Sequence, residues 1–331
     1  MNTAPLRPYW YPVARADEIG DGPMSTQLLG ERLAVYRGKS GRYGAFRDLC
    51  IHRGTPLSLG WVDGDELVCA YHGWAYAESG QCTRIPSLPE GRPIPAKARA
   101  SAFPARERHG LVWVALEEPV SDVAAFPEAD DPSYRTIWTT YHWKASAPRV
   151  IENVMDFAHF PWVHPGVLGH REKPVYPDVA IERTGGGFAY TVDDEATNAI
   201  RRYTVSLPLA LHMWVGRRGA AGPAAALAPT TAPDERITGL FFAARPITER
   251  ETMFYFGHAR NFALDQADAV WAERNTSVTE QDRRIVEAQR PEELPLDLSA
   301  ELHLKGSDAP AVEYRRALAR MGIEAQPGST S

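Results

Sequence analysis

Two pairs of cysteine and histidine lie close together in the first third of the chain. One residue separates Cys50 from His52, and two residues separate Cys69 from His72. Thiolate sulfur and imidazole nitrogen are the ligands by which proteins hold zinc ions and many iron–sulfur centres. Four such groups in one short segment therefore predict a metal centre held by two neighbouring loops.

The order of the ligands favours an iron–sulfur cluster over a zinc ion. Zinc sites usually place their cysteines in one pair and their histidines in another, whereas each pair here contains one of each. A [2Fe–2S] cluster in which one iron takes both thiolates and the other takes both imidazoles needs this mixed arrangement. A zinc site is the alternative. Four glycines between and beside the ligands would permit tight loops with free backbone N–H groups: Gly54, Gly60, Gly64 and Gly73.

A second group of candidate ligands lies in the stretch "ENVMDFAHFPWVH". Asn153, Asp156 and His159 recur every three positions, so that a helix would place them near one face. His164 lies five positions after His159, and Pro161 is expected to end or kink the helix between them. Such a break would bring two imidazoles to one metal ion. The structural alternative is that both histidines are hydrogen-bonded packing residues.

Two histidines and one carboxylate form the ligand set of non-heme Fe(II) oxygenases, which leaves positions open for dioxygen. The carboxylate is expected in the long helical segment "DQADAVWAERNTSVTEQDRRIVEAQ", which contains no glycine or proline. Glu280, Asp282 and Glu287 are the candidates in and just after its last turns, and spacing alone does not separate them.

Both motifs resemble those of one known family. "CIHRG" followed by "CAYHGW", with sixteen residues between His52 and Cys69, resembles the motif of Rieske proteins. "WYPVA" and "GLVWVAL" resemble the edges of the Rieske domain in oxygenases that attack aromatic compounds. The run N-x2-D-x2-H-x4-H is similar to the mononuclear iron motif of the same oxygenases, and the resemblance extends over nearly the whole chain.

The resemblance implies a role for each candidate residue. Asp156 would be a carboxylate that links the two metal centres, and Asn153 would lie near the iron without clearly ligating it. The resemblance implies four ligands for the Rieske [2Fe–2S] cluster: Cys50, His52, Cys69 and His72. It implies three ligands for the mononuclear Fe(II): His159, His164 and Asp282.

The family also implies an assembly and partners. In a head-to-tail homotrimer, Asp156 would join His72 of one subunit to His159 of the next. Electrons from NAD(P)H would arrive through a separate reductase, or a reductase and a ferredoxin, because the sequence has no glycine-rich dinucleotide motif.

The chain is expected to be the terminal component of such an oxygenase, with dioxygen as co-substrate. Its compact length resembles the group of vanillate O-demethylase, dicamba monooxygenase and phthalate dioxygenase, which favours monooxygenation or O- or N-demethylation of an aromatic or heteroaromatic compound. The alternatives are a cis-dihydroxylating ring dioxygenase, a Rieske electron carrier with an inactive second domain, and a zinc-stabilised interaction module.

The elements that must position these residues form two groups. From Trp10 to about Leu116, short β-type segments alternate with Gly, Asp and Pro, which predicts a small antiparallel sandwich or barrel. The acidic segment "EEPVSDVAAFPEADDPSYR" is a candidate linker. Beyond it, strand and helix patterns predict an α+β domain, and the resemblance implies a helix-grip (START/Bet v1-like) fold there. The predicted domains are residues 1–120 and 121–331.

Composition and charge argue against a nucleic-acid-binding, membrane-spanning or secreted protein. A net charge of −6 gives no attraction to nucleic acid, and the apolar runs are too short to cross a membrane. The sequence shows no secretory signal, and three cysteines are no disulfide framework, so a cytoplasmic location is expected.

The substrate pocket is the least defined part of the prediction. "SLPLALHMWV" and "GLFFAARPI" would line a pocket or pack in the core. The segment Gly219–Pro233 is expected to cover the pocket mouth. Four arginines could bind a substrate carboxylate: Arg201, Arg202, Arg217 and Arg218.

Overall fold

The computed structural model describes residues 3–218 and 236–323. The chain divides into two compact units, one of Arg7–Val123 and one that combines Met1–Leu6 with Ala124–Ser331. The boundary at Val123 falls inside the acidic segment that was expected to be a linker. The division into domains 1–120 and 121–331 stays a prediction.

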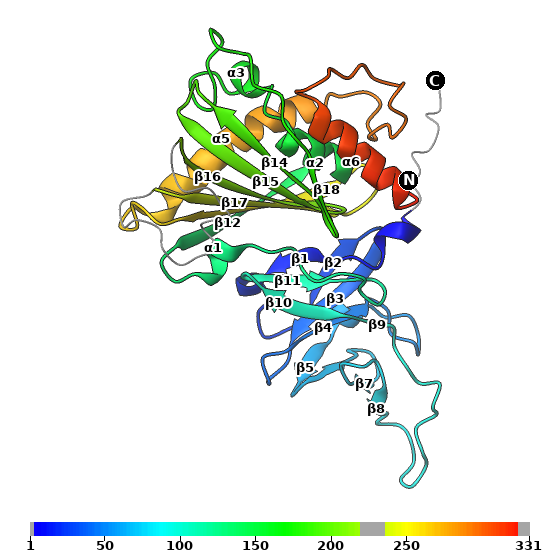
Figure 1. Ribbon diagram of the computed structural model, residues 1–331. Helices are drawn as coiled ribbons and strands as arrows, with labels where there is room; N and C mark the ends of the chain where they lie inside the picture. The colour runs from blue at the N-terminus through cyan, green and yellow to red at the C-terminus, as the bar shows by residue number, and fades with distance from the viewer. Residues whose placement is uncertain (1–2, 219–235, 324–331) are drawn as a thin grey trace. The chain divides into compact units, whose positions relative to one another are not determined.

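The first unit consists of three small antiparallel sheets, as the short β-type segments predict (Figure 1). The first sheet has the order β1-β11-β10, with β1 (Tyr11–Arg15), β10 (Ala105–Arg108) and β11 (Leu111–Val114). The second has the order β2-β3-β4-β9, with β2 (Met24–Leu28), β3 (Glu31–Arg37), β4 (Tyr43–Arg47) and β9 (Ala102–Phe103). The third has the order β5-β6-β7-β8, with β5 (Trp61–Asp63), β6 (Glu66–Val68), β7 (Ala75–Tyr76) and β8 (Cys82–Arg84).

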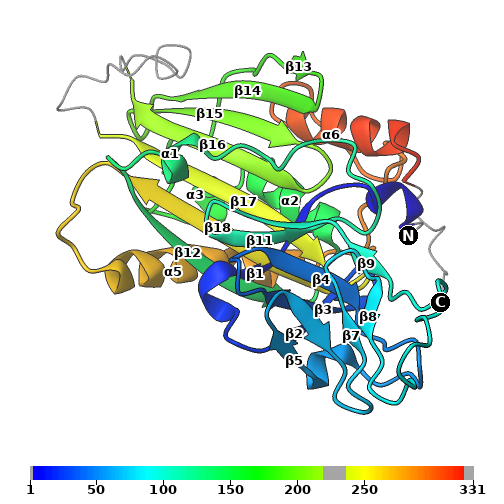
Figure 2. The same cartoon turned by 90° about the horizontal axis from the view of Figure 1, so that it is seen from below.

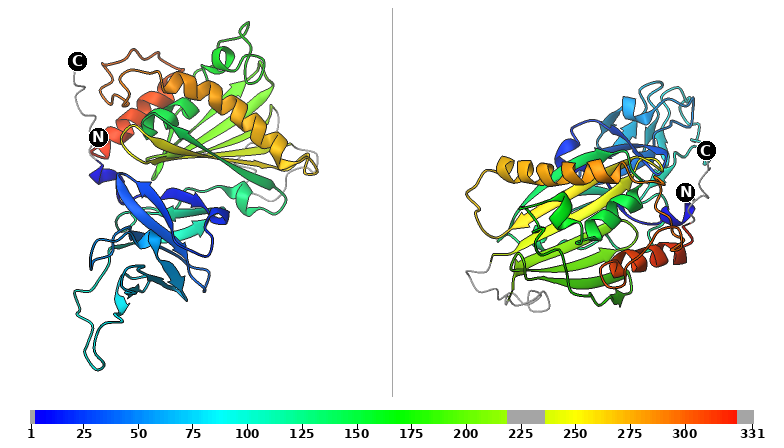
Figure 3. Two further views of the ribbon diagram at one scale, coloured as in Figure 1. Left: turned by 180° about the vertical axis from the view of Figure 1, so that it is seen from behind. Right: turned by 90° about the horizontal axis from the view of Figure 1, so that it is seen from above.

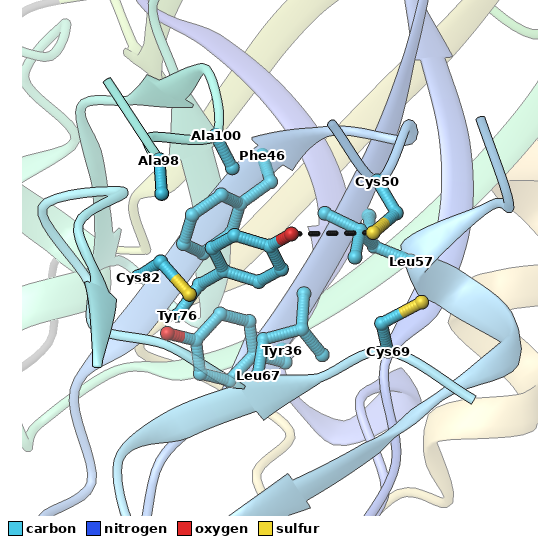
Figure 4. Close-up of a cluster of buried hydrophobic side chains, with 11 residues drawn as sticks. Tyr36, Phe46, Cys50, Leu57, Leu67, Cys69, Tyr76, Cys82, Ala98 and Ala100 are labelled. Atoms are coloured by element: carbon cyan, nitrogen blue, oxygen red, sulfur yellow. Dashed lines mark hydrogen bonds between the residues drawn. The ribbon is translucent and has the colours of Figure 1, made fainter. Parts of the chain in front are cut away.

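The third sheet carries the predicted cluster ligands on the loops beside its strands. Asp63 pairs with Glu66, so a two-residue turn joins β5 to β6. Gly64 in this turn has φ 65°, which is a conformation that glycine adopts without strain. Two short 3-10 helices, η2 (Ala16–Glu18) and η3 (Leu57–Leu59), complete the unit. Leu57 is buried and lies close to Cys50 in the core (Figure 4).

The second unit is built on one seven-stranded antiparallel sheet of order β12-β18-β17-β16-β15-β14-β13 (Figure 2). Helices α2 (Ala147–Met155) and α5 (Asp268–Val286) lie across one face of this sheet (Figure 3). This arrangement is the helix-grip fold that was expected. The strands are β12 (Arg135–Trp143), β13 (Glu182–Thr184), β14 (Gly187–Asp194), β15 (Ala199–Ser206), β16 (Ala210–Arg217), β17 (Thr238–Pro246) and β18 (Thr252–Arg260). The remaining helices are η1 (Ala4–Leu6), α1 (Pro127–Asp130), α3 (Phe160–Val163) and α6 (Ala309–Arg320).

Several elements differ from the expectation. The segment "IRRYTVSLPLALHMWV" has a strand pattern throughout, but it forms two strands, β15 and β16. Leu207 to Leu209 form the turn between them, and Pro208 has no N–H for a sheet hydrogen bond. Strand β12 and helix α6 were not predicted. Helix α1 lies inside the expected linker.

Candidate metal centres

The two loops that carry the cysteines have the same backbone construction. The N–H of Cys50 donates to the carbonyl of Thr55 at 2.8 Å, and Gly54 N–H donates back to Cys50 at 2.9 Å. Each of these bonds has its counterpart in the second loop, four and five positions after the cysteine.

In that second loop, Cys69 N–H donates to Trp74 at 2.9 Å and Gly73 N–H donates to Cys69 at 3.0 Å. Gly73 has φ 69°, and an added Cβ would lie 3.1 Å from Cγ of Pro86. The repeated pattern therefore needs glycine at this position, and it places both cysteines at equivalent points of two loops.

The histidines of the two loops lie beside each other. The ring centroids of His52 and His72 are 4.5 Å apart, and His52 stacks on Trp74 at 4.5 Å. Nδ1 of His52 is buried and has no hydrogen-bond partner within residues 3–218 and 236–323. Burial, with the nearby His72 and Arg53, lowers the pKa of His52, which favours the neutral form that binds metals.

The two cysteines are buried in the core of this unit (Figure 4). Figure 4 shows their sulfur atoms on one side of Tyr76 and Cys82 on the other. The Tyr76 hydroxyl lies 3.2 Å from Sγ of Cys50. Burial raises the pKa of the Cys69 thiol, so a thiolate there requires a positive partner such as a metal ion. Two buried sulfurs and two adjacent imidazoles, on two loops of the same construction, fit a [2Fe–2S] cluster.

The second group of candidates does not lie on one helix, which corrects the expectation. Helix α2 ends at Met155, and Asp156 is extended with ψ 138°. The carboxylate Oδ1 of Asp156 then accepts the N–H of Ala158 at 2.8 Å. Asp156 and His159 therefore leave the helical face that carries Asn153, because this side-chain bond stabilises a turn in place of the next helical turn.

Pro161 begins a helix where it was expected to end one. It occupies the first turn of α3, where its missing N–H costs no helical hydrogen bond. His159 immediately precedes α3 and His164 follows it, with His164 N–H donating to Phe160 at 3.0 Å. The short helix brings the two imidazole centroids to 5.3 Å.

One of the three candidate carboxylates meets these two imidazoles. Oδ1 of Asp282 lies 3.3 Å from Nε2 of His159 and 3.0 Å from Nε2 of His164. Nε2 of His164 and Oδ1 of Asp282 are buried without a hydrogen-bond partner among the residues that the structure describes. Three converging ligand atoms with unused lone pairs are what a metal ion requires, and all lie within 4.8 Å of one another.

The other two candidates interact elsewhere. Glu280 pairs with Arg283 at 2.5 Å, and Glu287 accepts the N–H of Lys144 at 2.8 Å. Helix α5 buries Trp271, Asn275, Thr279 and Val286, and Asp282 extends this stripe. The stripe contains polar residues, which is why its spacing was not recognised as a buried face.

Each imidazole is oriented through its other nitrogen. Oδ2 of Asp156 lies 3.0 Å from Nδ1 of His159, and Oε1 of Gln281 lies 2.7 Å from Nδ1 of His164. With the proton on Nδ1, both rings present the Nε2 lone pair toward Asp282. Sequence reasoning missed Gln281; its position directly before a candidate ligand was the one available signal.

The charges around these residues favour a cation. Burial disfavours the charged form of His159, but the carboxylates of Asp156 and Asp282 outweigh burial and raise its pKa to about 9. Burial likewise opposes the charged form of Asp282, yet His159 and His164 lower its pKa. A divalent cation supplies the positive charge that the carboxylates otherwise draw onto an imidazole.

A cavity of about 360 Å³ begins at this ligand group. Aromatic and aliphatic side chains make up most of its wall, and a few polar groups interrupt them. The wall includes Asn153, Phe256, His258, Trp271 and Asn275, together with the three candidate ligands.

The arginines expected to bind a substrate carboxylate are largely committed to acidic partners. Arg201 reaches the cavity wall and pairs with Asp194 at 2.6 Å. Arg202 pairs with Glu182, and Arg218 pairs with Asp193. Arg217 is exposed. The predicted covering segment Gly219–Pro233 lies outside the described residues.

Fold and site together define a Rieske-type non-heme iron oxygenase: an all-β unit with paired Cys–His loops, and a helix-grip unit with a His–His–Asp group at a cavity. Comparison with known families supports this class. Residues 9–104 match the Rieske [2Fe-2S] domain, and residues 143–324 match the vanillate O-demethylase oxygenase C-terminal domain. The chain belongs to this family of oxygenases, which are oxidoreductases that use dioxygen.

Characterised relatives align over most of the chain. It is 31% identical to methylxanthine N1-demethylase NdmA of Pseudomonas putida, over 98% of this chain and 91% of that protein. It is 28% identical to the dicamba O-demethylase oxygenase component of Stenotrophomonas maltophilia, over 86% of this chain and 87% of that protein. The structure of NdmA with caffeine covers 96% of this chain and 91% of that one, with a TM-score of 0.84. No helix in the described ranges has the length and apolar character that crossing a bilayer needs.

Proposed function

We propose that this chain is the terminal oxygenase component of a multicomponent system and that it monooxygenates, or O- or N-demethylates, an aromatic or heteroaromatic compound. The observation that carries the proposal is the convergence of His159, His164 and Asp282 at the wall of a largely apolar cavity. The demethylase relatives named above support removal of a methyl group as the favoured outcome.

The residues that would hold each group are the candidate ligands described above. Cys50, His52, Cys69 and His72 would hold the Rieske cluster, and His159, His164 and Asp282 would hold mononuclear iron. When bound, the mononuclear iron supplies the oxidising chemistry of dioxygen at the substrate carbon. The apolar wall holds a flat ring and excludes water, while Asp156 and Gln281 keep the two imidazoles in the ligating orientation.

The overall reaction balances as follows for a methyl ether or N-methyl group. One oxygen atom of O2 is inserted into a C–H bond of the methyl group, and the product separates into formaldehyde and the free hydroxyl or N–H. Two electrons and two protons reduce the other oxygen atom to water. We assign the supply of these electrons to an NAD(P)H-dependent reductase, alone or with a ferredoxin, because the sequence has no dinucleotide motif.

We further propose a head-to-tail homotrimer. Large apolar side chains are exposed around the cluster loops: Leu49, Ile51, Leu59, Trp61 and Tyr71. A second exposed apolar group follows His159 in the other unit: Trp162, Val167 and Val175. His72 is exposed in the first group, and the Asp156 side chain is 37% exposed next to the second. A heterologous contact between these two surfaces would let Asp156 accept a hydrogen bond from His72 of the next subunit.

The test is metal analysis and turnover of one preparation. Purified without oxygen, the chain is expected to contain about three irons and two acid-labile sulfides, from one cluster and one mononuclear site. With a surrogate reductase, NAD(P)H and O2, it should release formaldehyde from a panel of O-methyl and N-methyl aromatic compounds. Bound zinc with no sulfide would overturn the proposal. A full set of metals with cis-diol as the only product would replace demethylation by dihydroxylation.

His159→Ala provides an internal control for that test. It is expected to lose the mononuclear iron and formaldehyde release while the visible spectrum of the cluster stays unchanged. His142, which is exposed on β12, offers the matched variant His142→Ala, which should keep both.

A further inference from the structure

The two candidate histidine ligands flank a helix that is too short to be stable alone. Helix α3 has four residues, and an isolated helix needs about 12 or more residues to form in water. Its position therefore depends on tertiary contacts. Phe160 and Pro161 are its buried residues. The contacts of Phe160 should thus help to decide where the imidazoles of His159 and His164 lie.

Phe160 contacts both a guanidinium group and one of the candidate ligands. Cζ of Arg201 lies 5.6 Å from the centre of the Phe160 ring, which is within the range of a cation–π contact. The same ring is perpendicular to the imidazole of His159, and the two centroids are 4.9 Å apart. Arg201 is 6% exposed and lies on β15, so a strand of the sheet contacts the short helix through this ring.

A buried carboxylate fixes the guanidinium of Arg201. Nη1 of Arg201 donates to Oδ2 of Asp194 at 2.6 Å, and Nη2 donates to Oγ1 of Thr197 at 3.3 Å. Thr197 in turn donates to Asp194 through its N–H and its hydroxyl. Burial opposes the charged form of Asp194, but the hydrogen bonds from Thr197 and Arg201 outweigh burial and lower its pKa. The pair therefore stays ionised, and it adds no net charge to the wall of a cavity that is to hold a cation.

We propose that Arg201 is a positioning residue for the mononuclear iron site. Held by Asp194, its guanidinium fixes the ring of Phe160 and, through that ring, the helix whose two ends carry the candidate histidine ligands. This inference rests on the proposed function and deepens it, because it names the contact that keeps the two imidazoles where a metal ion can bind them.

Two measurements on the same set of variants test the proposal. The first is calorimetric titration of Fe(II), without oxygen, into protein that contains the cluster but no mononuclear iron. The second is hydrogen–deuterium exchange of residues 157–168, which reports the order of α3 whether or not metal binds. Val163 N–H donates to His159 at 2.9 Å and His164 N–H donates to Phe160 at 3.0 Å, so these amides should exchange faster when the helix is released.

A neutral pair removes the cation while it retains the net charge and the capacity for hydrogen bonds. For Arg201→Gln combined with Asp194→Asn, we expect about tenfold weaker Fe(II) binding and about tenfold faster exchange of the α3 amides. Phe160→Leu leaves the ion pair intact and should have the same effects. All three substitutions together should also cost about tenfold rather than about a hundredfold, because both changes break the same contact.

The neighbouring pair on the same strand provides the matched control. Arg202 pairs with Glu182, and successive side chains of a strand face opposite sides of the sheet. Arg202→Gln combined with Glu182→Gln should change neither the Fe(II) affinity nor the exchange of α3. If the neutral-pair variant fails to fold, Phe160→Tyr, which keeps a ring face, is compared with Phe160→Leu, and only leucine should weaken Fe(II) binding.

Unchanged Fe(II) affinity in the neutral-pair variant would overturn the positioning role, as would losses that simply add in the combined variant. The two proposals fail separately. A protein whose α3 amides lose protection in these variants but which never binds Fe(II) retains the ordering of α3 by Arg201 and loses the proposed function. One that binds Fe(II) and demethylates, while every variant behaves like the unaltered protein, retains the function and loses this inference.

Discussion

Oε1 of Gln281 lies 2.7 Å from Nδ1 of His164, although 117 positions of sequence separate the two residues. His164 is completely buried, and its Nε2 points at Asp282. Oε1 of the glutamine accepts a hydrogen bond from Nδ1–H and so fixes the tautomer that leaves Nε2 free for a metal ion.

Replacing Gln281 by leucine should weaken iron binding at the mononuclear site. Without the acceptor, His164 can carry its proton on Nε2, and we expect a loss of about 10- to 100-fold in iron affinity. The measurement is titration of Fe(II) into the cluster-containing protein, with Gln289→Leu at an exposed position as the control. Unchanged affinity in Gln281→Leu would show that packing alone orients His164.

Asp156→Asn should separate metal binding from product formation. An asparagine has one acceptor oxygen where the aspartate has two, so it cannot accept from His159 and from a second imidazole and also retain the bond to Ala158. We expect both metals to stay largely bound while product formation falls about 10- to 100-fold or more. Iron content and single-turnover oxidation of the reduced cluster measure the two effects.

The matched control is Asp265→Asn, at an exposed residue before α5. Full turnover by Asp156→Asn would rule out the linking role of this carboxylate.

The Tyr76 hydroxyl should raise the reduction potential of the cluster. It lies 3.2 Å from Sγ of Cys50, and a hydrogen bond to a cluster thiolate stabilises the reduced, more negative state. Tyr76→Phe is expected to lower the midpoint potential by some tens of millivolts without loss of iron or sulfide. Tyr36→Phe removes a hydroxyl from the same core that donates to the carbonyl of Asp65, and it should leave the potential nearly unchanged. Equal shifts in the two variants would contradict the assignment.

A buried ion-pair group anchors helix α2, which ends directly before Asp156. Arg315 on α6 donates to both carboxylate oxygens of Glu152 at 2.7 and 2.5 Å, and to Glu301 at 2.6 Å. Its side chain is 2% exposed. Arg315→Met leaves Glu152 without its partner, while Glu301 keeps its pair with Arg149 at 2.8 Å. We expect the free energy of unfolding to fall by roughly 3–5 kcal/mol.

Urea denaturation that monitors the second unit measures this loss. Arg320→Met is the control on the same helix, because that side chain is 59% exposed and its buried partner Glu313 keeps its pair with Arg183. It should cost about 1 kcal/mol or less. Similar losses in the two variants would show that burial of the Arg315 group does not matter.

Short stretches of sequence were enough to predict the cluster ligands, the antiparallel first unit and the histidine pair. The mixed Cys–His pairs predicted a [2Fe–2S] centre because all four ligands lie on two loops whose hydrogen bonds close within five residues. Short alternating segments predicted the antiparallel first unit, since most strand pairs there, such as β5 with β6, join close neighbours in the sequence. The pair His159 and His164 was found for the same reason.

The path of the chain around these histidines was not predicted correctly. A three-residue repeat suggested one helix, but the carboxylate of Asp156 bonds to the N–H of Ala158 and the helix ends at Met155. The hydrophobic periodicity does not reveal where such a side-chain bond replaces a helical hydrogen bond, because the pattern does not depend on hydrogen bonds between polar side chains and the nearby backbone.

The sequence by itself thus determined the two classes of unit and the family, and it supplied the candidate metal ligands. Residue spacing left Glu280, Asp282 and Glu287 open, and the family resemblance implied Asp282. The tertiary structure brought Asp282 to the two imidazoles and Gln281 to His164, and it paired His258 with Asn275. These contacts join residues of strand β18, helix α5 and the segment around α3. Their distances depend on how these elements pack against one another, and residue spacing does not determine that packing.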